Sequence, residues 1–192
     1  MKIEATMNTG SQRKKIHPHK FTLWVAIASI VMMFAGLTSA YIVKGSQPGW
    51  TSIEVPKIFY YSTVVILLSS FTIQWALKSF KERKMQLYRR LITLTAVLGI
   101  SFIAMQIVGF NTLWNDGTTF RGSGAGQFLY VIFGLHALHV LGGAIALLVM
   151  FFKAFSAKFR SYNPVPVEVA ATYWHFVDLL WVYLFVFFLW QT

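Results

Sequence analysis

The chain has 192 residues, of which 56% are hydrophobic, 17% are aromatic and only 12% are charged. Because about a quarter of the residues of a soluble domain are charged, this composition excludes an ordinary soluble globule. Cysteine is absent, which excludes disulfides, cysteine-ligated zinc, iron–sulfur clusters and thiol chemistry in this chain.

The first apolar run extends from Phe21 to Val43 without a charged residue. A helix rises 1.5 Å per residue, so this run is long enough to cross a hydrocarbon core of about 30 Å. A cleaved signal peptide is the alternative, since residues 13–15 are basic, but the apolar part of a signal peptide has only about 7–15 residues. We therefore predict a membrane span at 21–43, preceded by a basic, flexible tail at residues 1–20.

Four further apolar stretches of similar length follow along the chain. Prolines precede the second and the fifth span, charged residues separate the second from the third, and a glycine-rich segment precedes the fourth. The sequence thus predicts an all-α integral membrane bundle of five transmembrane helices, built as a single domain over residues 21–192. The predicted spans are 21–43, 58–77, 91–110, 127–152 and 170–190.

The lysines and arginines divide unequally between the two sides of such a bundle. Fourteen of the 17 fall on the side of the N-terminus, and only Lys44, Lys57 and Arg121 fall on the other. Since cytoplasmic loops of membrane proteins are enriched in these residues, we predict the N-terminus inside and the C-terminus outside. The same distribution accounts for the net charge of +11, which points to anionic membrane lipids and not to nucleic acid.

Four ionisable side chains lie within the predicted spans: His136, His139, His175 and Asp178. Each costs roughly 2.5–3.5 kcal/mol on insertion scales and needs a structural or functional reason. A metal or haem site is one hypothesis, because imidazole is a common ligand and a carboxylate often orients it. The other is that His175 and Asp178 pair with each other or with a neighbouring helix, and that the other two histidines form hydrogen bonds across helices. We favour the second, because the two pairs lie at different depths.

One further pattern in the spans indicates packing and no ligand chemistry. Small residues of the fourth span, among them Gly134, Ala137, Gly142 and Gly143, predict a surface on which neighbouring backbones approach closely. The chain has no phosphate-binding loop, dinucleotide-binding turn or recognisable nucleophile motif. The residues alone leave a small transporter or channel, and a haem-binding electron carrier using His136 or His139, as competing functions.

The fifth span contains the motif Tyr173–Asp178 within a longer apolar stretch that runs from Glu168 to Phe185. This stretch resembles the last helix of the cytochrome c oxidase subunit III family, and Tyr173–Asp178 is its most specific part. The segment Gly134–Gly143 of the fourth span resembles the same family's other hallmark. Shorter similarities follow in chain order in the other spans, at Phe34–Leu37 with Tyr41, at Leu67–Ser70, and at Phe102 with Gln106. The resemblance covers all five spans and implies the five-helix bacterial form.

The resemblance implies subunit III of a haem-copper terminal oxidase in the bacterial cytoplasmic membrane. Such a subunit binds the catalytic subunit I and other oxidase subunits, stabilises the catalytic subunit, and supports proton uptake and oxygen access. It implies no catalytic centre, metal or cofactor in this chain, haem and copper in the partner catalytic subunit, and bound phospholipid. The whole complex reduces oxygen with electrons from cytochrome c or quinol. Residues expected to serve structure or proton uptake are His136, His139, Glu168, Trp174, His175 and Asp178.

Two positions depart from the family's pattern. Ile30 and Gly109 stand where the resemblance implies glutamates, so functions of those carboxylates do not transfer to this chain. Their loss favours a scaffold role over a direct proton relay, and it keeps open a subunit-III-like protein of a nitric-oxide reductase system as the alternative within the family.

Overall fold

The computed structural model describes residues 18–46, 50, 55–117, 124–155 and 164–191. All five of its helices are long and apolar enough to cross a membrane, and the described residues contain no strand. The predicted all-α bundle of five membrane-spanning helices is therefore confirmed. The helices are α1 Pro18–Gly45, α2 Ile58–Lys81, α3 Met85–Asn115, α4 Gly124–Phe155 and α5 Val165–Trp190.

The helix ends differ from the predicted spans by a few residues. Pro164 and Pro166 flank the first residue of α5, where a missing backbone N–H is harmless, so the helix begins at Val165 and not at residue 170. Helix α1 begins at Pro18, three residues before the predicted span. The predicted flexible tail otherwise falls on residues 1–17, which lie outside the described residues.

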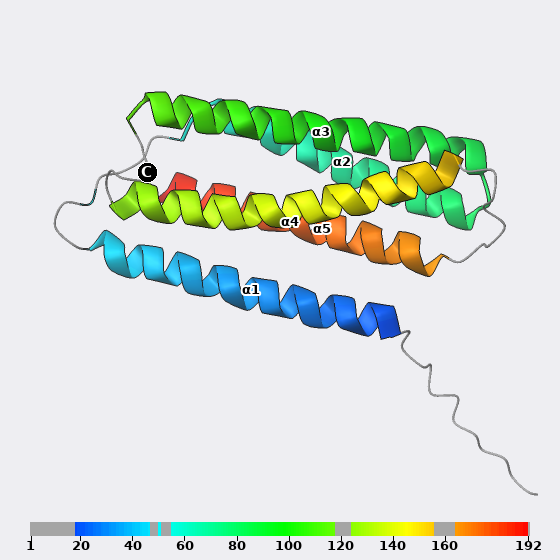
Figure 1. Cartoon of the computed structure of the whole chain (residues 1–192), viewed down its shortest axis with the longest axis horizontal. Helices are drawn as coiled ribbons and strands as arrows, with labels where there is room; N and C mark the ends of the chain where they lie inside the picture. Colours follow the sequence, from blue (N-terminus) through cyan, green and yellow to red (C-terminus); the bar gives the residue numbers. More distant parts are fainter. Residues whose placement is uncertain (1–17, 47–49, 51–54, 118–123, 156–163, 192) are drawn as a thin grey trace, which may run out of the picture.

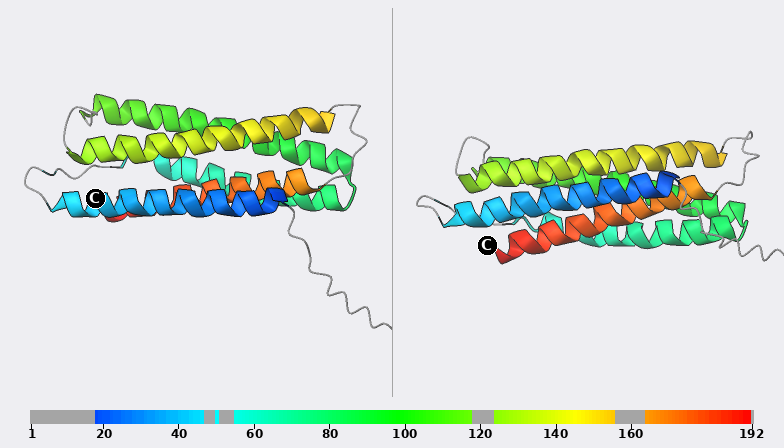
Figure 2. Two further views of the ribbon diagram at one scale, coloured as in Figure 1. Left: turned by 60° about the horizontal axis from the view of Figure 1, so that its bottom comes forward. Right: turned by 90° about the horizontal axis from the view of Figure 1, so that it is seen from below.

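Helix α5 is the central element of the bundle. It packs against α1, α2 and α4, while α3 packs against α2 and α4. Figures 1 and 2 show the five helices running side by side along the long axis of the molecule. Half of the apolar window of α5 is buried inside the bundle, against 17–28% in the other helices. The last helix is therefore the one around which the others are placed.

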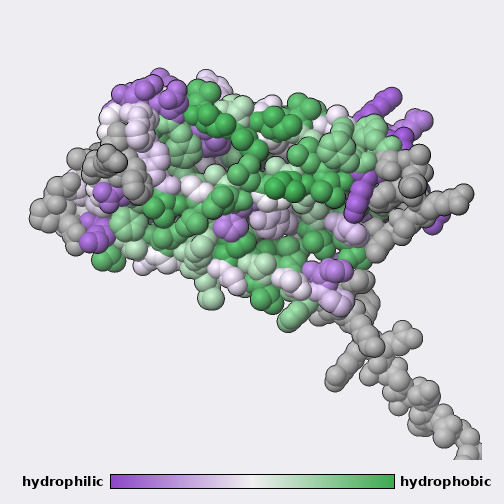
Figure 3. Space-filling model, viewed as in Figure 1, coloured by the Kyte–Doolittle hydropathy of each residue, from purple (hydrophilic) through white to green (hydrophobic). Residues whose placement is uncertain are grey.

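The surface of the bundle is apolar along its middle and polar toward its ends (Figure 3). Large side chains such as Met32, Phe71 and Leu179 are at least 69% exposed. Lipid tails, unlike water, accept such a surface at no cost. The end that holds the start of α1, the α2–α3 connection, the end of α4 and the start of α5 is called the basic end below. Its described cations are Lys20, Lys78, Lys81, Arg83, Lys84, Arg89, Arg90 and Lys153.

Trp174 of α5 joins four helices in the half of the core nearer the basic end. Its indole Nε1–H donates a hydrogen bond to Ser69 Oγ of α2 at 3.1 Å. A Cβ atom placed on Gly99 of α3 would lie 3.2 Å from the indole ring, and one placed on Gly143 of α4 would lie 2.9 Å from it. Only glycine therefore lets α3 and α4 approach the ring without a shift of the ring or a backbone.

The small residues of α4 do not form the single packing surface expected from the sequence. Gly143 is buried against Trp174, whereas Gly134, Ala137 and Gly142 are exposed. An α-helix has 3.6 residues per turn, so residues at these spacings lie on more than one face of α4. One glycine of the set thus carries the close helix contact.

Replacing Gly143 with alanine is expected to destabilise the bundle by about 1–3 kcal/mol, the usual cost of overpacking a filled core. The added methyl would stand 2.9 Å from Trp174 Cε3. Thermal unfolding of the purified full-length chain in detergent measures the effect. Gly134→Ala is the matched control on the same helix, because nothing lies within 4 Å of its added Cβ. Equal melting temperatures for G143A and G134A would contradict the packing described for Trp174.

Candidate functional site

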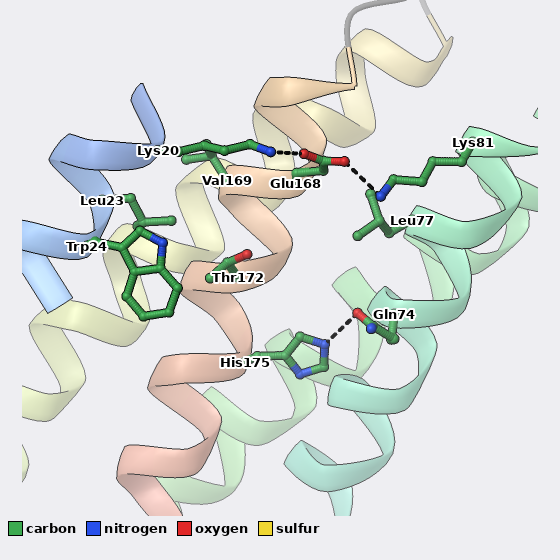
Figure 4. Close-up of a pocket in the computed structure, with 10 residues that line it drawn as sticks. All are labelled: Lys20, Leu23, Trp24, Gln74, Leu77, Lys81, Glu168, Val169, Thr172 and His175. Carbon is green, nitrogen blue, oxygen red and sulfur yellow. Dashed lines mark hydrogen bonds and ion pairs between the residues drawn. The ribbon is translucent and has the colours of Figure 1, made fainter. Parts of the chain in front are cut away.

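A row of polar side chains on α5 faces α2 and α1 near the basic end. Glu168, Thr172 and His175 follow at intervals of four and three residues, which places them on one face of the helix. With residues of α1 and α2 they line a pocket of about 480 Å³ (Figure 4). The other residues that line it are Lys20, Leu23 and Trp24 of α1, Gln74, Leu77 and Lys81 of α2, and Val169 of α5.

Glu168 bridges two lysines at the mouth of this pocket. Its Oε2 lies 2.5 Å from Lys20 Nζ of α1, and its Oε1 lies 2.7 Å from Lys81 Nζ of α2. Glu168 occupies the first turn of α5, where the helix dipole favours a negative charge. Exposed ion pairs contribute only about 0–1 kcal/mol each, and both lysines are substantially exposed. The bridge therefore acts mainly by fixing three helix ends next to one another.

His175 lies deeper in the pocket and contacts α2 through both ring nitrogens. Nε2 is 3.1 Å from Gln74 Oε1, and Nδ1 forms a short hydrogen bond with Ser70 Oγ. Ser70 and Gln74 are four residues apart and so share one face of α2. The imidazole is thus held on both sides by a neighbouring helix.

Asp178 is enclosed in the core one turn further along α5. It is 2% exposed, and neither carboxyl oxygen has a hydrogen-bond partner of standard geometry within the described residues. The direct His175–Asp178 pair that the sequence allowed is not formed, because both ring nitrogens of His175 engage side chains of α2. The second possibility, contact with a neighbouring helix, describes His175.

His136 and His139 of α4 lie apart from this row. The His136 ring packs against Trp181 in a tilted arrangement with 5.3 Å between centroids, and neither of its nitrogens has a hydrogen-bond partner within the described residues. His139 Nδ1 bonds to Leu135 O of its own helix at 2.7 Å. The predicted hydrogen bonds from these rings across helices are therefore wrong: one ring is enclosed by aromatic side chains, and the other is satisfied locally. The contact across helices runs instead from Tyr173 OH to the His139 carbonyl oxygen, at 3.2 Å.

The structure thus brings together Glu168 and His175, places Asp178 behind them, and leaves the α4 histidines elsewhere. The described residues contain no group of three or more His, Cys, Asp or Glu side chains that could hold a metal ion. We did not predict from the sequence that Lys20, Ser70, Gln74 and Lys81 are parts of the site. The spacing of Ser70 and Gln74, two polar residues four apart in an apolar span, was the signal that could have revealed the α2 side of it.

Comparison with known proteins identifies the family to which this chain belongs. A family model of cytochrome c oxidase subunit III matches residues 2–192. The chain belongs to the cytochrome c oxidase subunit III family. A probable cytochrome c oxidase subunit 3 of Nocardia farcinica is 32% identical over 165 residues, covering 83% of this chain and 81% of that protein. The cytochrome c oxidase subunit 3 of Bacillus sp. (strain PS3) is 31% identical over 170 residues, covering 84% of this chain and 80% of that protein.

A longer relative shows the same similarity over a smaller share of its length. The cytochrome c oxidase subunit 3 of Petromyzon marinus is 33% identical over 137 residues, which are 71% of this chain and 50% of that protein. The resemblance inferred from the motifs is therefore confirmed, and the subunit-III-like protein of a nitric-oxide reductase system is not favoured. Members of the subunit III family do not themselves carry the metal centres of the oxidase.

The structure explains one departure from the subunit III pattern. A Cβ placed on Gly109 would lie 2.5 Å from Phe59 Cε1 and 2.9 Å from Phe59 Cζ. Phe59 is 1% exposed and belongs to the aromatic core. The phenyl ring therefore occupies the space that a carboxylate at position 109 would need. At the other departure, Ile30 is partly buried and packs against the same core.

Gly109→Ala is expected to destabilise the bundle, and Phe59→Ala to destabilise it by about 3–5 kcal/mol through the cavity it leaves. In the double variant the methyl no longer meets the ring, so its loss of stability should be smaller than the sum of the two single losses. A double-mutant cycle of unfolding free energies measures this coupling. Gly36→Ala, with nothing within 4 Å of its added Cβ, is the control. Strict additivity of G109A and F59A would show that Phe59 does not exclude a side chain from position 109.

Proposed function

We propose that this chain is the non-redox subunit III of a haem-copper terminal oxidase in a bacterial cytoplasmic membrane. It binds the catalytic subunit I, which holds the haem and copper, and stabilises that subunit during turnover. Membership of the subunit III family carries the proposal. The filled core around Trp174 supports it, because it leaves the bundle as a rigid body suited to support a neighbour.

The haem and copper of the oxidase do not fit the polar residues of this chain. His136 is enclosed by the rings of Trp181 and Phe34, and His139 engages its Nδ1 in its own helix. His175 has both nitrogens engaged by α2. The described histidines within the spans thus offer no ligand set, which agrees with a subunit whose chemistry is performed by its partner.

The basic end is proposed to face the cytoplasm. Its cations outnumber those of the described opposite end, where only Lys44 and Lys57 lie, as expected from the enrichment of lysine and arginine on the inner side. Glu168 and His175 then meet the aqueous phase from which an oxidase takes its protons. The lysines there attract anionic phospholipid headgroups, and the apolar flanks of the bundle offer oxygen a path through lipid.

A transporter or channel is the competing class of function. It requires a polar path across the whole bundle, and the polar row of α5 ends at Asp178. Beyond Asp178 the interior is filled by a cluster of aromatic side chains, whose members include Phe59, Phe102, Phe133, Trp181 and Phe188. Such packing supports an accessory subunit rather than a transporter or channel.

Purification of the native membrane complex in mild detergent tests the proposed function. An affinity tag on this chain should retain a haem-copper catalytic subunit together with the haem absorbance and the oxidase activity. The isolated chain serves as the control and should show no haem absorbance. Recovery of the tagged chain without a haem-copper partner, or haem bound to the isolated chain, would contradict the assignment.

Site-directed labelling tests the proposed orientation, and the absence of cysteine from the chain makes every introduced thiol unique. Asp116→Cys lies after α3 at the opposite end, and Glu82→Cys lies after α2 at the basic end. A membrane-impermeant maleimide added to intact spheroplasts should label D116C at once and E82C only after permeabilisation. The reverse labelling pattern would place the basic end outside.

A further inference from the structure

The outer face of α5 lies in a groove between α1 and α2, called the α1–α2 groove below. Both of these helices pack against α5, but they do not contact each other within the described residues. Figure 4 shows α5 between them, with Trp24 on the α1 side and Gln74 on the α2 side. The pocket of about 480 Å³ is the part of this groove nearest the basic end.

The face of α5 that forms the floor of the groove has a heptad pattern. Five residues follow one another at intervals of three, four, three and four: Thr172, His175, Leu179, Val182 and Val186. This is the spacing at which one helix packs along another in a left-handed pair. None of the five is buried, and Leu179 and Val186 are 69% and 57% exposed. Within the described residues no helix covers the whole length of this seam.

Two polar side chains of the groove have unpaired hydrogen-bonding groups. Gln74 is exposed and uses its Oε1 for His175, which leaves the N–H groups of its amide without a partner within the described residues. Among the same residues the Thr172 hydroxyl has no partner either. Both side chains line the pocket (Figure 4). The pocket therefore presents hydrogen-bond donors to the molecule that occupies the groove.

The amide of Gln74 lies deeper than lipid headgroups reach. Lys81 pairs with Glu168 at the mouth of the pocket, and Gln74 precedes it by seven residues on α2, which is about 10 Å along the helix axis. The headgroup region on each side of a bilayer is only about 5–8 Å thick, and hydrocarbon follows. An unpaired amide in hydrocarbon is costly, so an acceptor supplied by a protein fits this position better than a lipid does.

The mouth of the groove adds a preference for negative charge. Glu168 pairs with both Lys20 and Lys81, which leaves one net positive charge. The two lysine side chains are 42% and 52% exposed, so a group that lies in the groove can reach them. Complementary charge favours an occupant with an acidic side chain at the basic end.

We propose that the α1–α2 groove is the docking site for one transmembrane helix of another subunit of the oxidase. Apolar side chains of that helix pack along the seam of α5. A carboxylate or amide side chain of the same helix accepts hydrogen bonds from Gln74 and Thr172, and an acidic residue at the basic end contacts Lys20 and Lys81. The presence of another oxidase subunit rests on the proposed function, whereas the position and chemistry of the surface come from the groove itself.

Photo-crosslinking within the native complex tests the docking site. A benzophenone amino acid in place of Leu179 reacts under ultraviolet light with whatever lies against the seam. Mass analysis of the tagged chain should show it coupled to a second, different polypeptide. Leu138 of α4 is the matched control, because it is also a leucine and is 64% exposed on another helix, and it should not couple to the same polypeptide. Coupling of position 179 only to lipid, only to a second copy of this chain, or to nothing would overturn the proposal.

Thr172→Val tests the polar contact with a variant of nearly unchanged shape. Loss of one hydrogen bond between helices in a bilayer should make the complex dissociate roughly threefold more readily. The measurement is the fraction of tagged chain that retains the other subunits as the detergent concentration rises. Thr112→Val is the control, because the Thr112 hydroxyl is exposed on α3 and bonds to Val108 of its own helix. Unchanged dissociation of T172V would overturn the polar contact.

Failure of the docking site and failure of the proposed function give different results. If the tagged chain retains a haem-copper subunit but position 179 couples to no other polypeptide, only the docking site is wrong. If the chain retains no haem-copper subunit, the proposed function is wrong and the docking site falls with it.

Discussion

The position of the Trp174 indole is the constraint on which the rest of the bundle depends. Helices in a bilayer gain no hydrophobic energy from one another, so packing and hydrogen bonds between them determine how they associate. Trp174 supplies both, because its ring fills the space left by Gly99 and Gly143 and its N–H bonds to Ser69. One side chain thereby sets the distances of α2, α3 and α4 from α5. It also fixes the rotation of α5 about its axis.

The rotation of α5 determines which neighbours its other polar residues face. With Trp174 turned into the core, His175 faces α2 and the pocket, and Asp178 is buried inside the bundle. The aromatic cluster of the other half of the bundle then closes the interior beyond Asp178. A bundle built this way has a filled aromatic core beyond Asp178 and a pocket lined by polar side chains near the basic end. These are properties expected of a subunit that supports a catalytic neighbour.

The spans and the family were predictable from the sequence, whereas the contacts of the site were not. Hydropathy identifies each helix, because a run of about twenty apolar residues indicates a membrane-spanning helix. The Tyr173–Asp178 motif identifies the family. The partners of His175 depend on which residues of α2 lie opposite it, and helix rotation and depth are not encoded in local pattern. The contacts of Ser70 and Gln74 with His175 therefore became known only from the structure. The packing of Phe59 beside Gly109 could not be predicted from the sequence for the same reason.

Our central claim has two parts: Trp174 fixes the position of α5 in the bundle, and this chain supports an oxidase whose haem and copper are bound by a neighbouring subunit. An electron cryomicroscopy map of the native complex tests both parts at once. We expect the map to show the indole of Trp174 between Gly99 and Gly143, within hydrogen-bond distance of Ser69, and haem and copper only in the neighbouring subunit. A map with the indole turned toward a partner chain, or with metal bound to histidines of this one, would contradict it.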